Sequence, residues 1–118
     1  MTSTLVTANE TDLGLLTLQY MKWNNIHHLT VVDNNEKFVG LITWQQLKKY
    51  WDQVHDSLNP IMARDIMVKD VFTADTLSPI HEAIALMKKH EIGCLPVLQD
   101  SQLVGIVTIK DLIQFDNA

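Results

Sequence analysis

The amino-acid sequence contains an internal repeat, which limits the possible folds more than any other feature of the chain. Under a shift of 66 residues, the identical pairs include Thr7 and Thr73, Ala8 and Ala74, Met21 and Met87, Lys22 and Lys88, Ile26 and Ile92, Leu29 and Leu95, and Val31 and Val97. After a turn that is one residue shorter in the second copy, a shift of 65 pairs Val39 with Val104, Gly40 with Gly105, Thr43 with Thr108, and Leu47 with Leu112. A single copy of about fifty residues has a marginal core, so we expect the two copies to stabilise each other.

Each copy shows the pattern of a strand, a helix, two strands and a second helix, which predicts an α/β (α+β) fold of two β-α-β-β-α repeats. In the first copy we expect strands at Leu5–Thr7, Leu29–Val32 and Phe38–Ile42, and helices from about Asp12 to Trp23 and from Trp44 to about Gln53. In the second copy we expect strands at Val71–Thr73, Leu95–Leu98 and Leu103–Thr108, and a helix after Thr108. Another helix should follow Ser78-Pro79, an N-cap residue before a proline at the first helical position.

The two copies are joined by a connector, residues 55–67, in which Asn59-Pro60 disfavours helix and bends the chain. We therefore expect a first repeat at residues 1–54 and a second repeat at residues 68–118. The composition of the 118 residues, 47% apolar and 19% charged, is that of an ordinary folded protein. Stretches without a charge reach about ten residues, far fewer than the eighteen or more of a membrane-spanning helix.

The charge of the chain indicates which partners it can bind, and its cysteine content indicates the kind of compartment in which it is found. The net charge is −5, and no cluster of Lys and Arg is present, so we expect no nucleic-acid partner. Cys94 is the single cysteine, which excludes an internal disulfide and fits a reducing compartment. The first residues lack the basic start and apolar centre of a secretory signal. We expect a cytoplasmic protein without direct membrane insertion.

Two similar stretches lie at equivalent strand-to-helix junctions, Gly40–Gln46 and Gly105–Asp111. In each stretch a threonine is followed three residues later by Gln or Asp, the spacing of a capping box. The same spacing also suits a ligand, because free N–H groups at a helix start favour a phosphate, and a carboxylate accepts hydrogen bonds from sugar hydroxyls. Both roles are compatible with the sequence.

These motifs, in this order, resemble those of a tandem pair of cystathionine-β-synthase (CBS) domains, also called a Bateman module. The resemblance covers nearly the whole chain and rests on the repeat, on Asp65-Ile66-Met67, on Leu95-Pro96-Val97 and on Gly105–Asp111. It implies two repeats that pack through their sheets with pseudo-twofold symmetry and form two clefts. In such modules the clefts commonly bind adenosyl compounds, and the module regulates an attached or associated protein.

The resemblance also implies which residues line each cleft. Cleft one would use Thr108 for phosphate and Asp111 for the ribose hydroxyls, together with Lys110, and would be lined opposite by Ile26 and His27. Cleft two would use Thr43 and Gln46, with Arg64 and Lys69 from the connector and Ile92 and Gly93 at a strand entry.

Each cleft departs from the family pattern. Gln46 stands where cleft two should have an aspartate. The repeat register places Met1 opposite Met67, so the leading wall of cleft one would lie before the first residue. A natural explanation of this second departure is that the chain was cut from a longer protein.

Other residue groups do not predict metal binding or catalysis. His27 and His28 are adjacent in a strand and point to opposite faces, and no Cys or carboxylate at a matching spacing completes a metal site. Cys94 opens an apolar strand and should be a small buried hydrophobe. The chain has no nucleophile elbow, Walker loop or paired carboxylates, so we expect a protein that is not an enzyme and binds no metal.

The second predicted helix of the first copy carries an apolar stripe of Trp44, Leu47, Tyr50 and Trp51. Such a stripe first of all predicts a face directed toward the core. An aromatic patch that stayed exposed would mark a partner surface, and modules resembling this one often dimerise through helices. We therefore expect a homodimer.

The predicted function is a regulatory module that binds an adenosyl ligand and requires no other cofactor. Arg64 is the sole arginine, so AMP is favoured over the more highly charged ATP, with ADP and S-adenosylmethionine as further candidates. Two alternatives stay open. One is a ligand-free structural or dimerisation module in which both threonines are helix caps only, and the other is a divalent-cation sensor.

Overall fold

The computed structural model describes residues 6–56, 58, 60–76, 80–90 and 92–108. They divide into two units, a first unit of residues 6–71 and a second unit whose described residues lie between 72 and 108.

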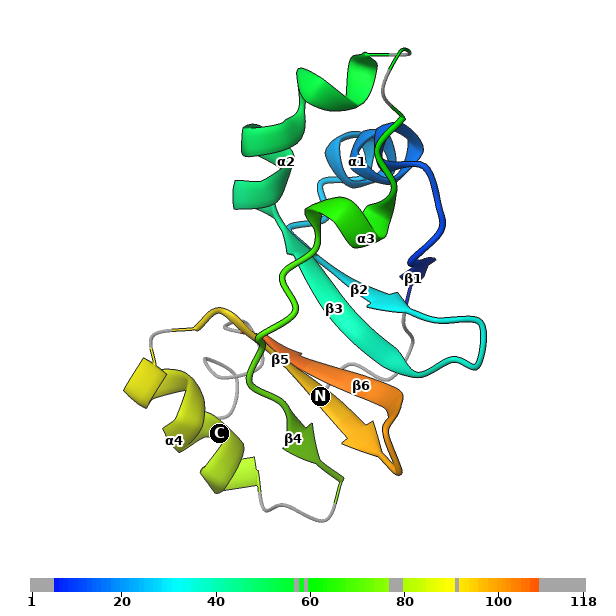
Figure 1. Ribbon diagram of the computed structural model, residues 1–118. Helices are drawn as coiled ribbons and strands as arrows, with labels where there is room; N and C mark the ends of the chain where they lie inside the picture. Colours follow the sequence, from blue (N-terminus) through cyan, green and yellow to red (C-terminus); the bar gives the residue numbers. More distant parts are fainter. Residues whose placement is uncertain (1–5, 57, 59, 77–79, 91, 109–118) are drawn as a thin grey trace. The chain divides into compact units, whose positions relative to one another are not determined.

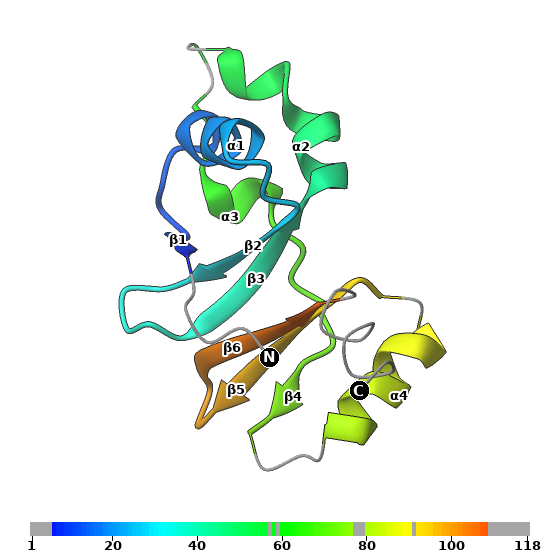
Figure 2. The ribbon, with the colours of Figure 1, turned by 180° about the vertical axis from the view of Figure 1, so that it is seen from behind.

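The first unit is a three-stranded sheet with helices on one side (Figure 1). Its elements are β1 (Thr7–Asn9), α1 (Gly14–Trp23), β2 (His28–Val32), β3 (Phe38–Thr43), α2 (Trp44–Tyr50), the 3₁₀ turn η1 (Gln53–His55) and α3 (Ala63–Ile66). The strand order is β1-β2-β3, with β1 parallel to β2 and β2 antiparallel to β3. Figure 2 shows the same arrangement from behind. This is the predicted strand, helix, strand, strand, helix order.

The core of the first unit forms where the apolar stripes of the helices meet the sheet. Its buried members include Leu18, Met21, Leu29, Val31, Ile42, Leu47 and Ile66. Trp44, Tyr50 and Trp51 are partly buried and pack against this cluster. The prediction that the α2 stripe is directed toward the core is confirmed.

The connector packs along the first unit through backbone hydrogen bonds. Gly14 N donates to Ile61 O over 2.6 Å, and Ala63 N donates to Asp12 O over 2.8 Å. Val68 and Leu41 exchange two further bonds of 2.8 and 3.0 Å. The described part of residues 55–71 therefore belongs to the first unit, while the sequence-based boundaries at 54 and 68 stay predictions.

The second unit has the same sheet topology as the first. Its described elements are β4 (Ala74–Asp75), α4 (Ile80–His90), β5 (Cys94–Gln99) and β6 (Gln102–Thr108), with strand order β4-β5-β6. Ala83 and Met87 of α4 pack against Leu95, Val97 and Val107 of the sheet. The two sheets also share their register, since Val31 pairs with Gly40 in the first and Val97 pairs with Gly105 in the second.

Some predicted boundaries differ from the structure. The strand expected at 71–73 is wrong: β4 is Ala74–Asp75, because these residues pair with Val97 and Leu98 of β5. The partner strand, rather than the β propensity of Val71 and Phe72, decides the position. Similarly, β1 lies at Thr7–Asn9 rather than 5–7, and α2 ends at Tyr50, short of Gln53. The helix expected after Thr108 lies outside the described residues.

Within the described residues, no helix combines the length and apolar character required to cross a membrane.

Candidate functional site

The first strand-to-helix junction is closed by a capping box around Thr43. Thr43 N donates a hydrogen bond to Gln46 Oε1 over 3.1 Å, and Thr43 Oγ1 donates to the same oxygen. The capping role predicted from the spacing is therefore confirmed at this junction. Two donors occupy both lone pairs of the amide oxygen, so Gln46 has only its Nε2 donors left for another partner.

His27 lies against the first residue of α2. Its ring is stacked on Trp44 with a centroid distance of 4.5 Å and an interplanar angle of 20°. Trp44 N donates to His27 O over 2.9 Å, and His27 Nε2 lies 3.2 Å from Asn25 Oδ1. The neighbouring Ile26 is partly buried and packs against the core cluster of the first unit. His27 thus has ring and hydrogen-bond partners within its own unit.

His28, the first residue of β2, lies directly opposite Thr43 in β3. The side chain is half-buried. Burial lowers the pKa of His28 below its ordinary value of 6.5, and the positive charge of a protonated His27 lowers it further. The imidazole is therefore held in its neutral form at neutral pH.

Arg64 in the connector and Lys69, two residues after its end, are the two cations predicted to face a ligand in cleft two. Both are exposed. Arg64 lies in α3, where its backbone N–H donates to Glu10 O over 3.0 Å. Lys69 follows Val68, which pairs with Leu41 of β3. The fold therefore holds both backbone positions against the first unit and leaves both side chains accessible to solvent.

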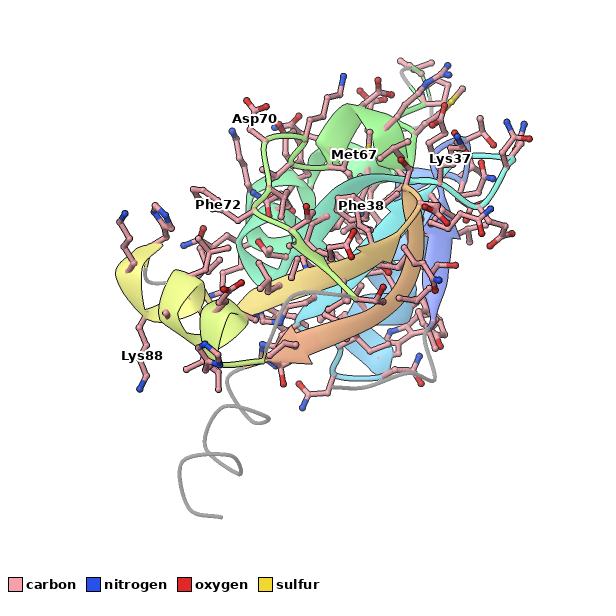
Figure 3. All side chains as sticks on the ribbon, turned by 90° about the horizontal axis from the view of Figure 1, so that it is seen from below. Lys37, Phe38, Met67, Asp70, Phe72 and Lys88 are labelled. Atoms are coloured by element: carbon pink, nitrogen blue, oxygen red, sulfur yellow. The ribbon has the colours of Figure 1, made fainter. Side chains whose placement is uncertain are left out.

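The second junction has the same register as the first up to Thr108. Thr108 ends β6 and lies opposite Cys94, the first residue of β5. Ile92 and Gly93 come immediately before β5, and Ile92 N donates to Met87 O over 3.1 Å. Phe72, labelled in Figure 3, stacks on His90 with centroids 4.0 Å apart. Lys110 and Asp111 lie outside the described residues.

The two hairpins therefore bring together the threonine and the strand entry of the same repeat. In the first unit this places Thr43 near His27, although the resemblance to CBS pairs implies that these residues belong to different clefts. In the second unit it places Thr108 near Gly93. The membership of the two clefts stays a prediction.

Cys94 is buried within the second unit, which confirms its expected place in an apolar strand. Burial raises the pKa of this thiol to about 12. The thiolate, which is the nucleophilic form, is thus strongly disfavoured. Among the described residues, no group of three or more His, Cys, Asp or Glu side chains could hold a metal ion.

Sequence reasoning missed two features of the first unit. One is the contact between Gly40 and Met67, since an added Cβ on Gly40 would lie 2.6 Å from the Met67 sulfur. The other is an open pocket of about 480 Å³ between β1 and α1, lined in part by Leu13, Leu16 and Tyr20. The three- and four-residue spacing of these apolar residues was the signal that could have revealed the second feature.

Comparisons with known proteins agree with the fold. A family model described as CBS domain matches residues 1–52 and 63–117. The inosine-5'-monophosphate dehydrogenase of Methanocaldococcus jannaschii is 31% identical over 111 residues, which cover 93% of this chain and 21% of the dehydrogenase. The chain thus spans about a fifth of the length of that relative.

Two solved structures have closely similar folds. The CBS domain pair of protein MJ0100, in complex with 5'-methylthioadenosine and S-adenosyl-L-methionine, has 27% identity and a TM-score of 0.81, covering 99% of this chain and 91% of that one. CBSX2 in complex with AMP has 18% identity and a TM-score of 0.83, covering 99% and 92%. The family model matches both halves of the chain, and the fold is shared with solved CBS pairs. The chain therefore belongs to the CBS domain family as a tandem CBS pair, which is a regulatory module.

Proposed function

We propose that this CBS pair binds an adenosyl ligand and transmits its occupancy to an attached or associated protein. The observation that carries the proposal is the common geometry of the two junctions, with Thr43 opposite His28 and Thr108 opposite Cys94. The CBS pair with 27% identity that was solved with 5'-methylthioadenosine and S-adenosyl-L-methionine supports this ligand class.

The second junction is the one we assign to the ligand. The Gln46 amide oxygen already accepts two hydrogen bonds from Thr43, and Nε2 can only donate. A ribose offers two hydroxyl donors, which a carboxylate accepts well. Asp111 supplies such a carboxylate three residues after Thr108, and Lys110 adds a positive charge beside it. The first junction then acts mainly as a helix cap.

AMP is the ligand we favour within the adenosyl class. Arg64 is the sole arginine of a chain with a net charge of −5. A triphosphate needs several cations for compensation, whereas a monophosphate needs fewer. The homodimer expected from the sequence belongs to the same proposal, since a dimer interface offers one route by which ligand occupancy can reach a partner protein.

Calorimetry and thermal unfolding with AMP, ADP, ATP and S-adenosylmethionine test the proposal. At about 100 times its dissociation constant, a ligand stabilises the folded chain by roughly 2.7 kcal/mol and raises Tm by about 10 °C. Asp111→Ala should abolish the shift, whereas the matched control Glu82→Ala, which removes an exposed acid from α4, should retain it. A shift that survives in Asp111→Ala would refute the assignment to the second junction.

A ligand-free structural module is the second candidate function. It is favoured by the capping box, because Thr43 and Gln46 satisfy each other without a ligand. The same titrations separate the two functions. Unchanged unfolding with all four compounds would favour the structural module.

A further inference from the structure

The open pocket between β1 and α1 has the size and the walls of a small-molecule site. Its volume of about 480 Å³ lies within the range of about 300–1,000 Å³ that is typical of ligand pockets. Ala8, Thr17 and Leu29 line the pocket and are buried, so its floor is fixed by the packing of the first unit. Leu13 and Leu16 are 48% and 59% exposed and form an apolar rim. An apolar molecule can therefore enter the pocket from solvent without a rearrangement of the core.

The second repeat shows that this pocket lining is not a requirement of the fold. Under the shift of 66 residues, Glu82 stands opposite Leu16, and Ser78 stands opposite Asp12, which lines the pocket. Glu82 is exposed on α4, a helix that packs on its own sheet as α1 does. The fold thus tolerates a charged residue at the position of Leu16. The apolar rim and the acid beside it are features of the first repeat, so we looked for a role beyond folding.

We propose that this pocket binds a small organic cation, namely an amine with an apolar body. The apolar body of the ligand would contact Leu13, Leu16 and Leu29, and its ammonium group would face the carboxylate of Asp12. The site is separate from the adenosyl clefts, since none of the residues assigned to those clefts lines the pocket. The inference therefore goes beyond the proposed function and does not depend on it.

Asp12 is held in place at the pocket by three hydrogen bonds. Its backbone N donates to Asn9 O over 2.9 Å, and its backbone O accepts from Ala63 N over 2.8 Å. Its Oδ2 accepts from Asn9 N over 2.9 Å. A carboxylate has about four lone-pair sites, so Asp12 can also accept hydrogen bonds from an ammonium group. Because the carboxylate is already ordered, ligand binding costs little conformational entropy at this residue.

The lining of the pocket suits a cation better than an anion. Of the described residues that line it, none is Lys, Arg or His. Tyr20 contributes an aromatic ring, whose face attracts a nearby cation. Thr17 Oγ1 already donates its hydrogen to Leu13 O over 2.9 Å, so this hydroxyl can only accept from a ligand. Lys22, the single charged residue of the α1 sequence, holds its Nζ 4.3 Å from the centroid of the Trp51 ring. Phosphates and carboxylates are therefore disfavoured at this site.

NMR titration of the isotope-labelled chain with tryptamine, tryptophol and indole-3-propionate tests the proposal. The three probes share an indole ring and differ in the charge of the attached group. We expect tryptamine to shift the amide signals of Thr7, Ala8 and residues 13–20, with a millimolar Kd that suits a ligand of this size. It should bind about two- to fivefold more tightly than tryptophol, as an exposed ion pair allows, and indole-3-propionate should bind most weakly. Equal affinity for all three probes, shifts confined to other residues or no binding at all would overturn the proposal.

Two variants separate the charge of the site from its shape. Asp12→Asn keeps an oxygen that can accept from Asn9 N but loses the negative charge, so it should remove the preference for tryptamine over tryptophol. Leu16→Ser shortens the apolar rim and should weaken the binding of both probes alike. Glu82→Gln, which removes an exposed acid from α4, is the matched control and should bind as the wild type does. Circular dichroism checks that each variant is folded. A preference for tryptamine that survives in folded Asp12→Asn would overturn the proposal.

Discussion

Met67 of the connector lies so close to Gly40 of β3 that a Cβ on Gly40 would stand 2.6 Å from the Met67 sulfur. The same Cβ would lie 3.0 Å from Val68 O, a backbone atom fixed by its pairing with Leu41. Met67 is labelled in Figure 3. The glycine that opens the first repeated motif therefore has a packing role, because it lets the connector cross β3.

Gly40→Ala should destabilise the chain by about 1–3 kcal/mol, since the extra methyl group forces the connector away from β3. Urea unfolding measures the loss. In a Met67→Ala background the added cost should be smaller, because the flexible sulfur is gone and only Val68 O remains close. Equal costs in both backgrounds would show that Met67 does not restrict this position.

Replacing Gln46 separates capping from ligand binding. Gln46→Leu leaves Thr43 N without its acceptor and should cost about 1 kcal/mol of stability. Gln46→Asp should keep most of the cap, because a carboxylate also accepts from Thr43 N and suits a helix N-terminus. The second oxygen of the introduced carboxylate should accept from a ligand hydroxyl and so create a second adenosyl site at the first junction. Calorimetry would then give two ligands per chain, and a stoichiometry unchanged at one would contradict the role assigned to the acid.

The lowered pKa of His28 predicts a pH dependence of stability. With its pKa lower in the folded state, the unfolded chain binds more protons as the pH falls below about 6.5, so stability is retained above this pH and decreases below it. Replacing His28 by Gln removes this contribution to the pH dependence of stability. Urea unfolding at pH 7.5 and at pH 5.5 measures the effect, and the wild type should lose more stability between these two pH values than His28→Gln. The control His81→Gln, at an exposed position of α4, should follow the wild type. Parallel curves for wild type and His28→Gln would refute the prediction.

Cys94 should be unreactive in the folded chain. With its pKa raised to about 12, its thiolate fraction at pH 8 falls on the order of a thousandfold relative to an unperturbed thiol, and burial restricts access further. Ellman's reagent should modify Cys94 rapidly in guanidinium chloride and only at the rate of unfolding in buffer. Fast modification in buffer would mean that β5 opens readily.

The local features of the chain could be predicted because neighbouring residues determine them. The threonine of each motif ends a strand, and Gln46 caps α2 as its spacing from Thr43 suggested. The hairpin strands were predicted within one residue at their ends, since alternation and turn residues mark them. By contrast, β4 was misplaced by three residues, because a two-residue edge strand is positioned by its pairing with β5.

The sequence by itself determined the repeat, the order of elements in the first copy and the family to which the chain belongs. Only the tertiary structure decided that the connector packs across Gly40, that α2 is covered while α1 presents Leu16 and Trp23 to solvent, and that His27 stacks on Trp44. The physical reason is the range of the interactions. Periodicity and capping act over three or four residues, whereas burial depends on segments that meet only after the chain has folded.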